Sequence, residues 1–153
     1  MSENVEIIQA AEINTNGIVL PREVRGAIDA VGMFASVKGG DTLENKVAVF
    51  NATSTSVSMS DEYNTPIDVV GIVIKPTQMT DINTGELVDS IMTVLIDKEG
   101  NGHMSHSKAV LSSIMNIVAS FGMPDEWPDG MRIVPIAQAG RSGFKYTTLK
   151  IAF

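Results

Sequence analysis

Two apolar stretches in the middle of the chain carry the strongest strand patterns. Residues 67–75 are apolar except for two charged side chains, which is typical of a central strand that is buried on both faces. Residues 87–97 are rich in isoleucine, methionine, valine and leucine, and they predict a second strand after a turn around Asn83-Thr84-Gly85. Gly71 predicts a bulge or sharp bend in the first of these strands, which a small curled sheet needs.

Residues 131–153 predict two further strands that are joined by a glycine turn. Because side chains alternate along an extended strand, residues 144–153 divide into two faces. The face that suits a core carries Lys145, Thr147, Leu149, Ile151 and Phe153. The opposite face carries Phe144, Tyr146, Thr148 and Lys150. Two aromatic rings and a cation that face solvent serve no structural purpose in a strand, and a flat anionic ligand would explain them.

Helical periodicity is clearest over residues 109–121. The predicted apolar stripe consists of Val110, Ile114, Ile117 (or Val118) and Phe121. Ser105 or Ser107 suits the N-cap, Gly122 suits the position after the last helical turn, and Pro124 prevents continuation. His103-Met104, before this helix, predicts a short returning strand.

The N-terminal part of the chain has weaker signals. Residues 1–19 show no firm pattern and predict a mobile arm or a short strand. A helix is predicted to begin at Pro21 and to end before Gly39-Gly40. It either packs on the main domain or contacts a neighbouring subunit.

Residues 45–52 alternate in the manner of a strand, with Lys46, Ala48 and Phe50 on one side. Residues 53–66 are rich in serine, threonine, aspartate and asparagine and predict a loop. Tyr63 in this loop is either a lid residue or an anchor.

The predicted order is an arm and a helix, three strands, a second helix and two strands. A helix between the third and fourth of five strands is the layout of the OB barrel. We therefore expect a mainly β chain: a five-stranded OB-type barrel with one helix between strands 3 and 4, plus an N-terminal arm and helix. Residues 1–40 would form the arm and helix, and residues 41–153 the OB domain.

Composition and charge narrow the class of protein. The absence of cysteine excludes disulfides and thiolate metal sites. No apolar run is long enough for a membrane span, and the acidic start does not resemble a signal peptide, so we expect a cytoplasmic protein. The formal net charge of −7 argues against attraction of nucleic acid to the whole surface. A local basic surface remains compatible with it, because residues 131–153 contain four cations and no acid.

Several short motifs between residues 45 and 153 carry a family resemblance. They are Val49-Phe50-Asn51-Ala52, Thr93-Val94-Leu95-Ile96 with Asp97 and Gly100, Ser107-Lys108-Ala109-Val110, and Ser142-Gly143-Phe144-Lys145-Tyr146 before Leu149-Lys150-Ile151. In order and spacing they resemble the single-stranded DNA-binding proteins of small protein-primed phages of Gram-positive bacteria and related conjugative-plasmid proteins. The resemblance implies an OB fold and sequence-tolerant binding of single strands during phage or plasmid DNA replication.

Proteins that bind single strands need cations for phosphates and aromatic faces for bases. The aromatic candidates are Phe50, Phe144 and Tyr146, with Tyr63 and Trp127 as further ones. The candidates for phosphate contact are Lys46, Lys75, Arg132, Arg141, Lys145 and Lys150. Since the first strand of an OB barrel lies near the last ones, Lys46 and Phe50 are expected to share a groove with residues 144–150.

Enzymatic, cofactor and metal chemistry are not indicated. His103 and His106 lack an evident third metal ligand, and Gly100-Asn101-Gly102 lacks the third glycine of a dinucleotide fingerprint. The expected function is a non-enzymatic protein that coats and protects single-stranded DNA, with self-association through the N-terminal arm. The alternative is a non-enzymatic OB-like protein-interaction or virion structural module, which the acidic middle strands and the negative net charge would favour.

Overall fold

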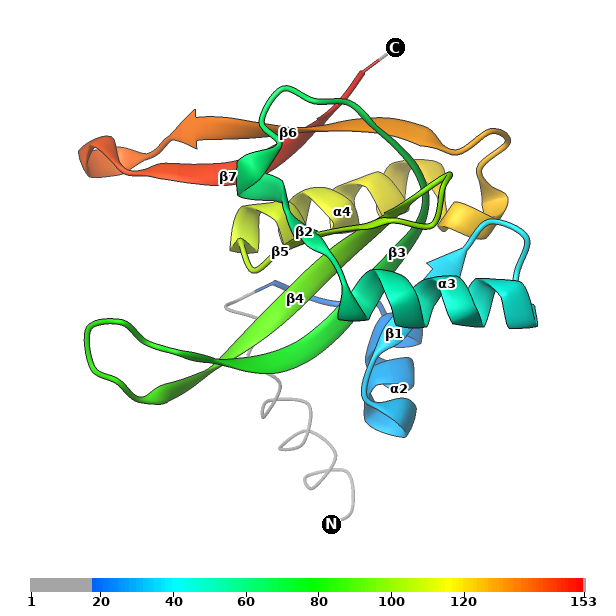
Figure 1. Ribbon diagram of the computed structural model, residues 1–153, viewed down its shortest axis with the longest axis horizontal. Helices are drawn as coiled ribbons and strands as arrows, with labels where there is room; N and C mark the ends of the chain where they lie inside the picture. Colours follow the sequence, from blue (N-terminus) through cyan, green and yellow to red (C-terminus); the bar gives the residue numbers. More distant parts are fainter. Residues whose placement is uncertain (1–17, 153) are drawn as a thin grey trace.

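The computed structural model describes residues 18–152 of the chain. A curled seven-stranded sheet forms its centre, with strands in the order β2-β5-β4-β3-β6-β7 and β1 paired to β3 beside that path (Figure 1). The strands are β1 (Phe34–Val37), β2 (Val57–Ser58), β3 (Ile67–Thr80), β4 (Leu87–Asp97), β5 (Gly102–Ser105), β6 (Met131–Ala139) and β7 (Lys145–Ile151). The α-helices of this part are α2 (Arg22–Val31), α3 (Leu43–Ser54) and α4 (Lys108–Phe121). Three short 3₁₀ turns are η1 (Met59–Asp61), η2 (Pro124–Glu126) and η3 (Arg141–Gly143).

The predicted strands of the middle and the C-terminal part are confirmed. β3, β4 and β5 form an antiparallel meander, α4 follows, and β6 and β7 form a hairpin. Counted from β3, the helix lies between the third and fourth of five strands, which is consistent with a barrel of the OB type. The strand count differs from the predicted five because β1 pairs with β3 and β2 pairs with β5.

Residues 45–52 are the main correction, because they belong to the helix α3 and not to a strand. The Thr42 side chain caps this helix by accepting from the backbone N–H of Asn45 at 3.1 Å. Val49 and Ala52, three residues apart, then turn inward, as a helix requires. So short a stretch fits both the strand and the helix period, and its valines favour a strand, so local pattern did not decide between them.

The predicted helix from Pro21 to Gly39 is also corrected, because α2 ends at Val31. Gly32 ends it in the left-handed conformation, with φ 87°, and its N–H bonds to Ile28 O. The chain then forms β1. Val24 and Ile28 of α2 are buried in the main core, as expected for a helix that packs on the main domain. The predicted arm falls largely on residues 1–17, which lie outside the described residues, and the division at residue 40 stays a prediction.

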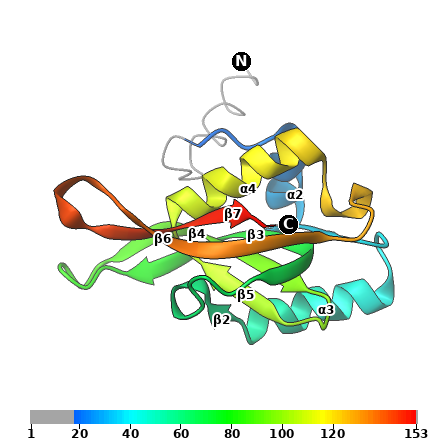
Figure 2. The same cartoon turned by 90° about the horizontal axis from the view of Figure 1, so that it is seen from above.

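Apolar side chains cover both faces of the sheet. The larger cluster includes Ile72, Ile74, Leu95, Ile114 and Ile133, and therefore joins α4 to the sheet. The smaller cluster joins α3 to the other face through Val49 and Ala52. Figure 2 shows α4 and α3 on opposite sides of the sheet.

The predicted irregularity at Gly71 is confirmed, since the register of β3 against β4 shifts between Val69 and Gly71. The first residues of β3 pair with β6, and the residues from Gly71 onward pair with β1. The bulge therefore lies where β3 changes partners along one edge, which is how a bulge curls a sheet.

Ser107 connects α4 to β7. In the described sheet, β7 is an edge strand that pairs with β6 on one side only. The Ser107 hydroxyl accepts from the backbone N–H of Val110 at 3.4 Å and donates to the Thr147 carbonyl at 2.6 Å. Ser107→Ala removes both bonds, and we expect it to lower the free energy of unfolding by about 1–2 kcal/mol in urea titrations. Ser112→Ala, on the exposed face of the same helix, is the matched control and should leave stability unchanged or slightly raised.

Candidate nucleic-acid interface

Two hairpins project from the same end of the molecule in both views (Figures 1 and 2). One is formed by β3 and β4, and the other by β6 and β7. Because β3 continues to Thr80, the predicted turn of residues 76–86 narrows to a tip at residues 81–86. Asp81, Glu86 and Asp89 make the β3–β4 hairpin acidic, whereas Arg141 and Lys145 make the end of the β6–β7 hairpin basic. An anionic ligand at this end is therefore attracted to the β6–β7 hairpin.

The two faces of β7 follow the predicted alternation with two exceptions: Lys145, predicted on the core face, is exposed, and Thr148, on the opposite face, is half-buried against α4. Thr147 and Leu149 are buried, while Phe144 and Tyr146 remain 76% and 42% exposed. The Tyr146 ring lies against the backbone of Gly140, where an added Cβ would be 3.3 Å from the ring carbons. The hairpin therefore presents two aromatic rings to solvent.

The predicted cations of this hairpin differ in their surroundings. Arg141, Lys145 and Lys150 are exposed, and no ion pair in the described part of the chain involves them. Arg132 donates from Nε to Asp68 Oδ1 at 3.1 Å, so part of its charge is already compensated. Lys75 is half-buried on β3, opposite Met92, away from the tip.

One cation beside this face was not among the predicted contacts. Ser107, Lys108 and Ala109, at the start of α4, line a hollow of about 450 Å³ together with Tyr146 and Thr147. Lys108 is exposed, and the helix N-terminus adds its partial positive charge. The sequence showed Lys108 directly after an N-cap, but only the packing of α4 against β7 brings it to Tyr146.

Lys46 and Phe50 do not join this surface, so the predicted shared groove is wrong. α3 packs on β4 and β5 and lies at the end away from the two hairpin tips (Figures 1 and 2). Phe50 is 69% exposed there, and Lys46 Nζ is 3.7 Å from Asp41 Oδ1. Any contact of these two residues with DNA stays a prediction, but it would be separate from β7.

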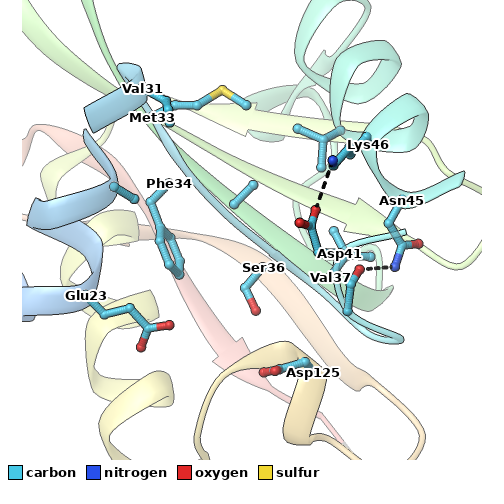
Figure 3. A pocket seen from close by; sticks show the side chains of 14 residues that line it. Glu23, Val31, Met33, Phe34, Ser36, Val37, Asp41, Asn45, Lys46 and Asp125 are labelled. Carbon is cyan, nitrogen blue, oxygen red and sulfur yellow. Dashed lines mark hydrogen bonds and ion pairs between the residues drawn. The ribbon is translucent and has the colours of Figure 1, made fainter. Parts of the chain in front are cut away.

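A pocket of about 610 Å³ lies between α2, β1, α3 and η2 (Figure 3). Its charged lining residues are Glu23, Asp41 and Asp125, with Lys46 beside Asp41. Three carboxylates against one lysine repel phosphate groups. This pocket is therefore a poor site for a nucleic-acid backbone.

The two remaining aromatic candidates are held within the fold. The Tyr63 hydroxyl is 2.7 Å from Thr147 Oγ1, as expected for an anchor in the loop of residues 53–66. Trp127 is buried, and its Nε1 donates to the carbonyl of Gly122 at 2.9 Å. Trp127 is thus a core residue and has no face available for a base.

His103 is the centre of a buried charge cluster. Nδ1 lies 2.7 Å from Glu62 Oε2, and Nε2 lies 2.8 Å from Asp97 Oδ2. Burial disfavours the charged ring, but the hydrogen bonds to Asp97 and Glu62 outweigh it and raise the pKa of His103. For Asp97, burial acts in the opposite sense to the bonds from His103, Asn101 and Glu99, which outweigh it and lower the pKa of Asp97. Each carboxylate accepts a hydrogen bond from a ring N–H, so both contacts are made together when the ring is protonated, and we call these three side chains the ion triad.

His106, the other histidine, lies apart from this triad. Its Nδ1 is 3.1 Å from Ser90 Oγ, and burial lowers the pKa of His106. No group of three potential ligands suited to a metal occurs among residues 18–152. No helix in that part of the chain is long and apolar enough to cross a membrane.

Comparison with protein families gave a match over most of the chain. The family described as phage single-stranded DNA-binding protein, of the phi29 type, matches residues 29–152. Comparisons with curated proteins and with solved structures gave no match. The match begins at the end of α2 and so includes β1 and the start of α3, for which the sequence motifs had no counterpart.

Proposed function

The chain belongs to the phage single-stranded DNA-binding protein family, and on this premise we propose that it holds single strands on the solvent face of β7 and the tip of the β6–β7 hairpin. Proteins of this family bind single-stranded DNA in replication, and the family is one of binding proteins rather than enzymes. This membership favours DNA binding over the alternative of a virion or protein-interaction module.

One observation carries the proposed surface: Phe144 and Tyr146 are exposed on the same hairpin as Arg141 and Lys145. Stacking of a base on an aromatic ring contributes about 1–3 kcal/mol, and it tolerates any sequence because every base has a flat face. Lys108, which lines the hollow beside Tyr146, and Lys150, which is exposed further along β7, extend the cationic surface. With a net charge of −7, the protein depends on this local surface to attract a strand.

Three further proposals complete this function. The strands β3 to β7 would form an OB-type barrel to which β1 and β2 are additions. The protein would act in the cytoplasm of the host cell, where phage DNA is replicated. Self-association through the N-terminal arm rests on the sequence pattern alone.

The proposed function predicts binding of fluorescently labelled oligo-dT that weakens as salt increases. Each phosphate contact on a single strand contributes about 0.7 to the slope of log K against log salt. We therefore expect Lys108→Gln and Lys145→Gln each to reduce the slope by about 0.7, measured by fluorescence titration.

Lys46→Gln is the matched control, because Lys46 lies on α3 at the other end of the molecule and should leave the slope unchanged. No binding at about 50 mM salt with micromolar protein would refute the function itself. If the salt slope changed in Lys46→Gln and not in Lys145→Gln, the DNA-binding surface would lie on α3 instead of the β6–β7 hairpin.

A further inference from the structure

Residues 57–66, which we call the strap, connect the two ends of the curled sheet. Its first residues form β2, which pairs with β5 in parallel. Met59 of η1 is fully buried in the main core. The backbone N–H of Asn64 then donates to Pro135 O on β6 at 2.8 Å. The strap therefore runs from β5 across to the β6–β7 hairpin, although no strand ladder joins β5 and β7 in the described topology.

His103 on β5 holds the strap at Glu62, near its middle. It donates to Glu62 of the strap and to Asp97 at the end of β4, and all three side chains are mostly buried. Other charged groups on the elements packed around β5 are Asp61 on η1, Asp89 on β4, and Glu44 and Lys46 on α3. None of these makes a hydrogen bond or ion pair with the ring in the described part of the chain. The ion pair between His103 and Glu62 thus holds the strap to β5.

Tyr63, the next residue after Glu62, joins the strap to β7. Its hydroxyl meets Thr147 Oγ1 at 2.7 Å, across 84 positions of sequence. Thr147 precedes Thr148 on β7 and directly follows Tyr146, one of the two exposed rings. Its carbonyl is also bonded by Ser107. The bond from Tyr63 thus fixes the side chain of Thr147, and the position of Tyr146 depends on Thr147 because the two residues are neighbours on β7.

We propose that the strap positions the DNA-binding hairpin, with His103 and Tyr63 acting as positioning residues for Tyr146 and Phe144. This inference rests on the proposed function of the β6–β7 hairpin. It assigns Tyr63 a role through its hydroxyl and not through stacking on a base. It also assigns a role to the ion triad, which the DNA-binding surface itself does not use.

The first test compares oligo-dT affinity among Tyr63→Phe, Thr147→Val and the double variant. Each substitution removes one hydroxyl and keeps the volume nearly constant. We expect each single variant to bind about three- to tenfold more weakly, and the double variant to bind no more weakly than either single one. Amide hydrogen exchange in β6 and β7 should be faster in Tyr63→Phe, although the Tm changes little.

Ser113→Ala is the matched control for this comparison. It removes the 3.1 Å contact between Ser113 Oγ and Thr148 Oγ1, which joins α4 to the next residue of β7 without involving the strap. Its affinity should equal that of the unaltered protein. Wild-type affinity in Tyr63→Phe with a large loss in Tyr63→Ala would show that the ring contacts DNA directly, and would overturn the proposal.

The second test uses pH at constant ionic strength. Because the pKa of His103 is raised above 6.5, its charge persists above that pH and is lost as the pH rises through the raised pKa. The bridges of the triad stabilise the fold fully below pH 6.5 and lose strength above it, so affinity for oligo-dT should fall severalfold across that window. His103→Gln should abolish this dependence. His106→Gln should keep it, because burial lowers the pKa of His106 and leaves that ring neutral there.

The failures of the two hypotheses are distinguishable. If the unaltered protein binds oligo-dT through Phe144 and Tyr146, but Tyr63→Phe and His103→Gln bind equally well, only the role of the strap is refuted. If Phe144 and Tyr146 can be removed without loss of affinity, the proposed surface fails. A loss of affinity in Tyr63→Phe that is matched by Ser113→Ala would reflect general loosening of β7 and would also refute the strap.

Discussion

Replacing both Phe144 and Tyr146 by alanine should weaken oligo-dT binding by about 2–6 kcal/mol, which is thirtyfold or more. The two rings are exposed, so neither is needed for the core, and stability should change by less than about 1 kcal/mol. Fluorescence titration at fixed salt gives the affinity, and urea unfolding gives the stability. Because both rings lie at one hairpin end, the double variant need not equal the sum of the single ones.

Phe50→Ala is the control for that prediction. Phe50 is also a largely exposed phenylalanine, but it lies on α3, away from the hairpin tips. Its removal should leave affinity and salt dependence as they are. The opposite result, with affinity lost at Phe50 and kept at the hairpin, would place the binding surface on α3 beside the acidic pocket.

Gly102→Ala should be the most damaging single substitution for the fold. A Cβ at Gly102 would lie 2.1 Å from the carbonyl oxygen of Ala52 and 2.7 Å from its carbonyl carbon. These are backbone atoms, so no side-chain rotation relieves the clash, and α3 must move away from β5. We expect a loss of about 3 kcal/mol in the free energy of unfolding, measured by urea titration. A domain of this size is commonly stable by only about 5–15 kcal/mol, so the loss is large.

Gly26→Ala provides the matched control, since Gly26 is exposed on α2 and nothing lies within 4 Å of an added Cβ. Helix propensity predicts that it stabilises the protein by about 0.5–1 kcal/mol. If Gly102→Ala were as stable as the unaltered protein, α3 would not be seated on β5, and the helical assignment of residues 45–52 would need revision.

The local parts of this fold were predictable because their signals lie within a few residues. α4 has an apolar stripe, an N-cap serine and a terminating glycine, and the sequence predicts all three, although Phe121 at the end of the predicted stripe is exposed and Ser107, not Ser105, is the cap. The buried strands β3 and β4 and the two faces of β7 follow from apolar runs and from alternation. The motifs in these elements also pointed to the family that the comparison found.

Residues 45–52 were predicted as a strand but belong to α3, because eight residues are too few to separate the helix period from the strand period. The helix is capped by Thr42 before it, and it packs closely on Gly102, which lies on the distant strand β5. The candidate site shows the same limit: Phe144 and Tyr146 were found from one strand, but Lys108 was not, because its position beside Tyr146 depends on helix packing. Lys46 and Phe50 were grouped with them on the basis of a strand that does not exist.

The sequence by itself determined the meander, the helix after it, the exposed rings of β7 and the family, since each depends on neighbouring residues. Only the tertiary structure decided how β7 is held. Tyr63 reaches Thr147 across 84 positions, and His103 reaches Glu62 across 41. Such pairs produce no periodic pattern in the sequence, because it is the curl of the sheet that brings the two partners together. The basic and aromatic face of β7, visible in the sequence, thus depends for its position on contacts that only the fold creates.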